Sequence, residues 1–207
     1  MLQHFVPIAG LLCTSVARTV VDLAREHGPP SALVAADRAL SGGLTSAAEL
    51  ARTLAECRRW PGVRAARNAI ELADGRAESP LESLSRLKLI EFGMPRPEPQ
   101  CLLGTRTGAP IGRVDFYWDE FGVVGEADGL EKYDGRPASL RDEKVRQERL
   151  EATGLVAVRW GWADLRDFDA MTYRVRRAFA EGQRRSGARG WTRLPRTSLD
   201  FDPRGAA

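Results

Sequence analysis

Three acidic residues in the C-terminal half of the chain have the types and spacing that a divalent metal site requires. Asp115 lies in the alternating segment 113–117, where the period of two directs it away from the apolar residues beside it. In the segment 123–129, the same alternation sets Glu126 and Asp128 side by side on one face of the next predicted strand. The carboxylates of Glu126 and Asp128 therefore share one face of a strand, and that of Asp115 lies on the preceding strand.

The polar, glycine-containing connection at 119–122 predicts a hairpin that brings Asp115 opposite Glu126. Carboxylates gathered in this way repel one another unless a cation compensates, and hard oxygen ligands favour Mg²⁺ or Mn²⁺ over zinc. Such an ion lowers the pKa of a bound water and polarises a phosphoryl oxygen, and phosphodiester hydrolysis needs both effects. The predicted cofactor is therefore Mg²⁺ or Mn²⁺, and the predicted chemistry is hydrolysis of nucleic acid.

Two further charged residues complete this predicted site. Glu82, at the start of a helix that precedes the strands, could complete the metal shell. Lys132, four positions after Asp128, could orient the water or stabilise the developing charge. The predicted catalytic set is therefore Glu82, Asp115, Glu126, Asp128 and Lys132, with the metal held by Asp115, Glu126 and Glu82.

A helix predicted over residues 140–152 carries basic side chains suited to phosphate contacts. Lys144 and Glu148 are spaced i to i+4 and share a face, with Arg141 and Arg146 nearby. Arg141, Lys144 and Arg146 are therefore the predicted contacts with nucleic acid.

Each of these residues also has a purely structural interpretation. Glu82 fits the capping box of Ser79 at a helix start. Asp115 fits an exposed position on an edge strand, whereas Glu126 and Asp128 fit the end of a strand and the turn after it. The lysines and arginines that follow fit a solvated loop and helix face.

The elements around these residues predict an α/β fold, in which a helical N-terminal unit precedes a mixed sheet flanked by helices. The helices are predicted from apolar residues at helical spacing, from capping residues, and from Gly or Pro where a helix should end. The strands are predicted from alternating apolar and polar residues or from short apolar runs. Helices are expected after a cap at Thr14 or Ser15, over 31–40, after Thr45, and over 65–72, 80–93, 140–152 and 170–181. Strands are expected over 100–103, 111–117, 123–128 and 155–160.

Composition and charge set wide limits on function. The 207 residues carry a net charge of +3, which permits a polyanionic partner but favours one only weakly. The three cysteines lack the paired spacing of a zinc site or a disulfide framework, so a reducing cytoplasm fits best. The apolar stretch 8–13 is too short to span a bilayer and does not resemble a targeting signal, so no membrane partner is expected.

Several segments of the C-terminal half together resemble the very-short-patch-repair-like branch of the PD-(D/E)xK nuclease superfamily, in the form found in actinobacterial proteins. Any one segment alone would be weak, but the combination is fairly specific. The resemblance covers roughly residues 76–165, and the segments that carry it are 79–82, 113–116, 125–129 with 132–133, 143–150 and 158–160.

This resemblance implies a restriction-endonuclease-like fold. It makes Asp115 and Glu126 the main metal ligands and Glu82 the first-helix acid, with Asp128 and Lys132 as supporting groups. The sequence departs from the family pattern at two positions. Asp128 stands where a lysine is expected two positions after Glu126, and an aspartate is usual at position 148, which is glutamate here.

The segment 14–24 resembles the middle part of abortive-infection-type antitoxin-like proteins, which often carry this nuclease-like domain. Those relatives usually begin with a DNA-binding winged helix, which is expected either to be absent here or to lie upstream of an alternative start. The resemblance implies a helical antitoxin-like or linker unit over 1–75 and a nuclease-like domain over 76–182. The Arg-, Gly- and Pro-rich residues 183–207 are expected to form a flexible basic tail, suited either to solubility or to contact with a nucleic-acid strand.

The leading prediction is a metal-dependent nuclease, with DNA as the favoured substrate. The alternative is a catalytically inactive nuclease-fold protein that binds DNA as a regulator in an antitoxin-like or phage-defence system. The missing lysine and the antitoxin-like segment motivate this alternative. A third expectation is that the N-terminal helices contact a protein partner or a second copy of the chain.

Overall fold

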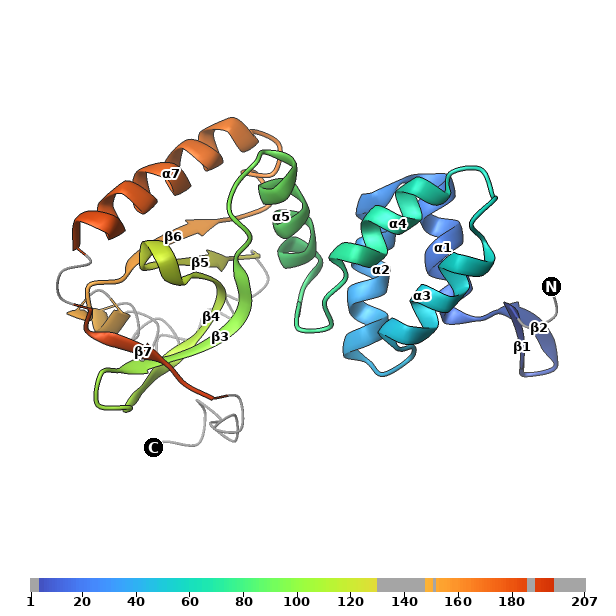
Figure 1. Ribbon diagram of the computed structural model, residues 1–207, viewed down its shortest axis with the longest axis horizontal. Coiled ribbons are helices and arrows are strands. Elements are labelled where there is room, and N and C mark those ends of the chain that lie inside the picture. Colours follow the sequence, from blue (N-terminus) through green and yellow to red (C-terminus); the bar gives the residue numbers. More distant parts are fainter. Residues whose placement is uncertain (1–3, 130–147, 151, 186–188, 196–207) are drawn as a thin grey trace. The chain divides into compact units, whose positions relative to one another are not determined.

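The computed structural model of the chain describes residues 4–129, 148–150, 152–185 and 189–195. Its contacts divide the chain into two units, Met1–Leu87 and Lys88–Ala207 (Figure 1). The boundary falls inside helix α5 (Pro80–Glu91), whereas the boundary predicted from the sequence lies between residues 75 and 76. The first unit is mainly helical and the second holds a mixed sheet, so the predicted α/β class is confirmed.

A β-hairpin opens the first unit. β1 (Phe5–Ile8) pairs antiparallel with β2 (Leu11–Thr14), and the turn residues Ala9 and Gly10 have positive φ angles of 49° and 81°. The sequence pattern does not predict this hairpin, because the apolar run is short and does not alternate clearly. Its apolar side chains are largely exposed, with exposed fractions of 56% at Ile8 and 69% at Leu11.

Four helices follow the hairpin, and serine caps start two of them. Ser15 Oγ accepts a hydrogen bond from the Arg18 N–H at 3.3 Å, and Ser46 Oγ accepts one from the Glu49 N–H at 3.2 Å. Of the two predicted caps of the first helix, Thr14 and Ser15, Ser15 is the one used, and its side-chain oxygen satisfies an otherwise orphaned N–H of that helix. The four helices are α1 (Val16–His27), α2 (Pro29–Ser41), α3 (Ala47–Glu56) and α4 (Val63–Leu72).

Small side chains allow these helices to pack closely. Ala24, Ala32, Ala66 and Ala69 are at most 1% exposed and share an apolar cluster with Leu33. The helices therefore bury their apolar faces against one another, and most of the exposed large apolar side chains described in this unit belong to the hairpin.

Charged residues of α1 form an arginine clamp on Trp60. The guanidinium groups of Arg18 and Arg25 lie 4.1 and 4.9 Å from the centroid of the Trp60 ring. Asp22 accepts hydrogen bonds from both arginines, at 2.7 and 2.9 Å, and so holds them over the ring. Arg18 and Asp22 belong to the antitoxin-like segment, and their observed contacts hold α1 against the connection that follows α3.

A buried ionic network ties α2 to the start of α5. The Asp37 carboxylate is 1% exposed and accepts hydrogen bonds from Ser83 Oγ and Arg86 Nη2, both at 2.6 Å. It also accepts one from the Asp74 N–H at 2.7 Å. Because burial of a charge is costly unless it is paired and hydrogen-bonded, these donors hold Asp37 in place. This network explains why the first unit extends to Leu87.

The second unit is built on a five-stranded mixed sheet with the strand order β6-β5-β4-β3-β7. The β5–β6 pair is parallel and the other pairs are antiparallel. The four strands predicted from the sequence are confirmed. The strands are β3 (Glu98–Thr105), β4 (Pro110–Trp118), β5 (Val123–Ala127), β6 (Val156–Trp160) and β7 (Trp191–Arg193), and the 3₁₀ turn η2 (Asp119–Phe121) joins β4 to β5.

Helix α7 (Phe168–Arg185) lies along one face of this sheet (Figure 1). Phe179 stacks on Phe121 with ring centroids 4.1 Å apart, and its edge meets Trp118 at 5.3 Å. Gly182 lies against the same turn, where an added Cβ would overlap the Phe121 carbonyl oxygen. The helix therefore approaches η2 more closely than any side chain at position 182 would allow.

The flexible tail predicted over 183–207 is wrong for two of its segments. Residues 183–185 continue α7, and Trp191–Arg193 form β7, which pairs antiparallel with β3. Trp191 is 4% exposed and packs in the apolar cluster on the sheet, so it is not available for base stacking. Tertiary pairing overrides the local Arg- and Gly-rich composition here. Residues 186–188 and 196–207 lie outside the described part of the chain.

Among the described residues, no helix is long and apolar enough to cross a membrane. The 18-residue helix α7, for example, carries five arginines.

Substituting Asp37 with Asn should lower the free energy of unfolding by about 3–5 kcal/mol, because it leaves the buried Arg86 guanidinium with only the more distant Asp74 carboxylate, 3.8 Å away, as a charged partner. Urea unfolding followed by circular dichroism measures this loss. The control is Arg52→Ala, which breaks an exposed pair with Glu49 and should cost less than about 1 kcal/mol. Equal, small effects of both substitutions would contradict the structural role of the network.

Gly182→Ala should destabilise the second unit, although alanine favours a helix more than glycine does. Overpacking against Phe121 costs about 1–3 kcal/mol, which exceeds or cancels a propensity gain of about 1 kcal/mol. Thermal unfolding measures the net change. Ala180→Gly, at an exposed position of the same helix, should follow propensity alone and lose about 1 kcal/mol. A clear stabilisation by Gly182→Ala would show that the close approach to η2 is not required.

Candidate functional site

Asp115 lies in the middle of the sheet, with both carboxylate oxygens engaged. It belongs to β4, which has β3 on one side and β5 on the other, and it is 9% exposed. Its Oδ2 accepts a hydrogen bond from the Ala127 N–H at 2.8 Å, and its Oδ1 accepts one from Gln100 Nε2 at 3.2 Å. The alternative of an exposed edge-strand aspartate is therefore wrong.

Glu126 is the second buried carboxylate, and it lies on the neighbouring strand. The pairing of β4 with β5 runs from Trp118↔Val123 to Phe116↔Gly125, which confirms the predicted antiparallel connection. One further step in this register brings Asp115 opposite Glu126, as predicted. Glu126 is 7% exposed and is paired in the parallel register with Arg159 of β6. The two carboxylates are thus neighbours across two interior strands.

Asp128 follows the end of β5 and differs from the other two acids in its exposure. Its side chain is 40% exposed, and its Oδ2 lies 3.9 Å from Arg159 Nη1. The Asp128 N–H donates to the Trp160 carbonyl at 2.9 Å, which extends the contact with β6 by one residue. The position agrees with the predicted strand end, and a supporting role toward Glu126 stays a prediction.

Glu82 has the structural role that its sequence position suggested. The Glu82 N–H donates to Ser79 Oγ at 3.2 Å, and Ser79 Oγ donates to Glu82 Oε1 at 2.8 Å. Glu82 Oε2 accepts a further hydrogen bond from the Glu78 N–H at 3.0 Å. The predicted capping box is therefore confirmed, with the carboxylate 2% exposed. A metal-ligating role for Glu82 stays a prediction.

Gln100 is a site residue that the sequence analysis did not identify. It is 7% exposed, and its side-chain amide donates to the Asp115 carboxylate. Its φ angle is +53°, a left-handed conformation that is uncommon for a residue other than glycine. The available sequence signal was a polar residue directly after the proline-rich connector 95–99, at the start of an otherwise apolar strand.

The opposite side of this strand pair is closed by aromatic rings. Phe116 stacks on Trp160 with ring centroids 5.2 Å apart. An added Cβ at Gly125 would overlap the Trp160 ring, so only glycine fits this position without a shift of the ring. The packing fixes β5 against β6 and so supports Glu126, which follows Gly125.

The remaining predicted site residues lie outside the described residues. These are Lys132, Arg141, Lys144 and Arg146. Within the described part of the chain, no group of three or more His, Cys, Asp or Glu side chains is placed to hold a metal ion. Asp115 and Glu126 nevertheless fit part of a site for a hard cation, because both are carboxylates and Mg²⁺ commonly binds to one or two carboxylates and completes its shell with water and phosphate oxygens.

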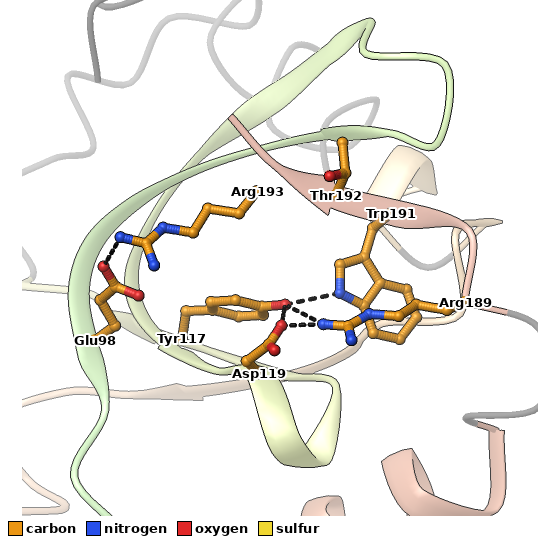
Figure 2. Close-up of a pocket in the computed structure, with 7 residues that line it drawn as sticks. All are labelled: Glu98, Tyr117, Asp119, Arg189, Trp191, Thr192 and Arg193. Carbon is orange, nitrogen blue, oxygen red and sulfur yellow. Dashed lines mark hydrogen bonds and ion pairs between the residues drawn. The ribbon is translucent and has the colours of Figure 1, made fainter. Parts of the chain in front are cut away.

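A polar cavity of about 430 Å³ opens between β3, β4 and β7 (Figure 2). Two ion pairs border it, Arg189 with Asp119 and Arg193 with Glu98. At its centre, the Tyr117 hydroxyl donates to Asp119 and accepts from Arg189 and from Trp191 Nε1, the last at 2.8 Å. Arg189 and Arg193 of the predicted tail thus attach the β7 segment to the rest of the sheet.

Two curated relatives match the chain, both from strains of Mycobacterium tuberculosis and both described as uncharacterized proteins. Each is 36% identical to the chain over 151 residues, which is 73% of this chain and 55% of the relative. The chain therefore spans about half the length of the curated relatives it matches. No known family profile matches the chain, and no solved structure matches it.

The hydroxyl of Tyr117 should make the second unit sensitive to alkaline pH. Burial, followed by the hydrogen bond to Asp119, raises the pKa of Tyr117 from 10.0 to about 12. Between these values the unfolded chain releases the phenolic proton while the folded chain retains it. Stability is therefore full below pH 10 and falls by up to about 2–3 kcal/mol as the pH rises to 12.

Urea unfolding at pH 9–12 measures this slope in the wild type and in Tyr117→Phe. The substitution should remove the Tyr117 contribution to the slope, although it also lowers stability at pH 9 by leaving the Trp191 N–H without its acceptor. Tyr173→Phe, at a residue that is 63% exposed, is the matched control and should leave the slope unchanged. If Tyr117→Phe and wild type lose stability in parallel, the hydroxyl is not the responsible group.

Proposed function

We propose that this chain is a metal-dependent nuclease, whose second unit hydrolyses phosphodiester bonds of nucleic acid, with DNA the favoured substrate. The observation that carries the proposal is the pair of buried carboxylates, Asp115 and Glu126, on adjacent interior strands. Carboxylates are rare at buried positions unless they are paired or coordinate a metal. The nuclease-like sequence segments described above support the same conclusion.

Each residue of the pair has a distinct part in the proposed chemistry. Asp115 and Glu126 would hold Mg²⁺ or Mn²⁺, and when bound the ion supplies a Lewis acid for the phosphoryl oxygen and a bound water of lowered pKa. Gln100 positions the Asp115 carboxylate through its amide. Asp128 would support Glu126, and Lys132 would orient the water or stabilise the developing charge.

The other predicted residues extend this proposal. Glu82 is proposed as the first-helix acid in addition to its capping role. Arg141, Lys144 and Arg146 are proposed as phosphate contacts. A cytoplasmic location is also proposed, since Cys13, Cys57 and Cys101 form no disulfide in the described structure. A protein partner or second copy on the N-terminal unit remains a prediction.

Glu126→Gln should abolish binding of Mn²⁺ or Mg²⁺ to the purified chain, because it replaces an anionic oxygen ligand with a neutral amide of the same size. Isothermal titration calorimetry measures the binding. Cleavage is the second readout. Both Glu126→Gln and Asp115→Asn should reduce Mg²⁺-dependent cleavage of duplex DNA by more than about 100-fold. Glu120→Gln, which removes an exposed carboxylate of the β4–β5 connection, should change neither quantity.

A second candidate function is supported by one observation. Both oxygens of Asp115 and both oxygens of Glu82 accept hydrogen bonds from the protein itself, so these acids also serve the architecture. A nuclease-fold protein that binds DNA as a regulator, without cleaving it, would keep them for this reason. Wild type that binds duplex DNA equally well in Mg²⁺ and in EDTA, with no cleavage and no effect of Asp115→Asn, would establish this candidate and overturn the nuclease.

A further inference from the structure

The outer surface of α7 is the most strongly basic helix surface in the described part of the chain. Five arginines on this helix are exposed, against one exposed and one half-buried acid, Asp169 and Glu181. At 100° per residue, Arg177 and Arg184 lie on nearly the same line, opposite the side that packs on the sheet. Tyr173, which is 63% exposed, lies on this line as well. This surface is distinct from the carboxylate pair and from the predicted contacts at 141–146.

Carboxylates on the protein neutralise this surface only in part. Glu181 binds both Arg184 and Arg185, and Asp164 binds Arg174. Within the described residues no ion pair joins a carboxylate to Arg177, whose guanidinium lies 5.9 Å from the Tyr173 ring centroid. An excess of positive charge therefore remains at the centre of the surface.

The arginine side chains surround a shallow hollow on this face. It has a volume of about 330 Å³ and is lined only by α7 residues, namely Arg174, Arg177, Ala178, Glu181 and Arg184. Three arginine side chains thus line one depression, together with the small side chain of Ala178. A phosphate group placed there would meet donors from several arginines and would compete with Glu181 for Arg184.

We infer that the outer face of α7 binds the phosphate backbone of duplex nucleic acid. Arg177 and Arg184 are separated by seven residues, or about 10 Å along the helix axis, so they present two positive charges in a row to the regularly spaced phosphates of a duplex. A row of like charges at this spacing complements a regular polyanion better than the irregular charges of an acidic protein. This inference depends on the proposed function only in taking nucleic acid as the partner, and it requires no catalysis.

The test is fluorescence anisotropy of the full chain with a labelled duplex DNA in EDTA, over a range of salt concentrations. The double variant Arg177→Gln/Arg184→Gln should bind about tenfold or more weakly near 0.1 M salt, and the slope of log affinity against log salt should fall by about two. Arg177→Lys/Arg184→Lys keeps the charge and should retain most of the affinity. Circular dichroism of each variant verifies that α7 is still folded.

The matched control is Arg58→Gln/Arg59→Gln, which removes two exposed arginines from the first unit. It should leave the affinity and the salt slope close to those of the wild type. The inference is overturned if this control weakens binding as much as the α7 variant does, if the α7 variant binds like the wild type, or if the wild type binds an acidic polypeptide but no duplex. Unchanged binding by Glu126→Gln, with loss of cleavage, would separate this surface from the proposed active site.

Discussion

The carboxylate of Asp115 sets the geometry of the second unit around it. Because it is buried between two neighbouring strands, each of its oxygens must accept a hydrogen bond from the protein or a ligand. The Ala127 N–H satisfies one oxygen, and this bond holds the end of β5 against β4 beyond the pair Phe116↔Gly125. The amide of Gln100 satisfies the other. Glu126, which directly precedes Ala127, is consequently held beside Asp115, and the proposed metal site would lie at this pair of buried carboxylates.

Much of this structure is encoded in local patterns that can be read from the sequence. The helices of the first unit begin and end at serine, glycine and proline signals. Ser15, for example, caps α1 by accepting a hydrogen bond from Arg18, only three positions later in the chain. The strands β3 to β6 follow from alternation or from short apolar runs. The antiparallel register that sets Asp115 opposite Glu126 follows from the short polar connection at 119–122. These features depend on interactions between residues that are close in the chain, and such interactions leave a periodic trace.

The features that could not be predicted depend on distant contacts. β7 is a strand because Leu103 offers it a pairing edge and Tyr117 offers Trp191 a hydrogen-bond acceptor, and neither is visible in the Arg- and Gly-rich composition of the segment. Gln100 contributes to the site through a side-chain hydrogen bond to Asp115, fifteen residues away in the chain, and the sequence does not reveal this contact. The boundary of the first unit depends on the contact of Asp37 with Arg86, two residues on separate helices. The charged residues of the antitoxin-like segment likewise gain their role from the distant Trp60.

The pairing of β3 with β7 also constrains the order in which the chain can fold during synthesis. The first unit ends at Leu87. Its contacts are mostly local and helical, and contacts of this kind form quickly. The first unit can therefore fold while the remainder of the chain is being made. β3 has one partner, β4, directly after it in the chain, but its other edge must wait until Arg193 has left the ribosome. During that interval an open edge of the central sheet is exposed to other nascent chains. β7 pairs with Leu103–Thr105, so it shortens the unpaired edge of β3 once it is in place.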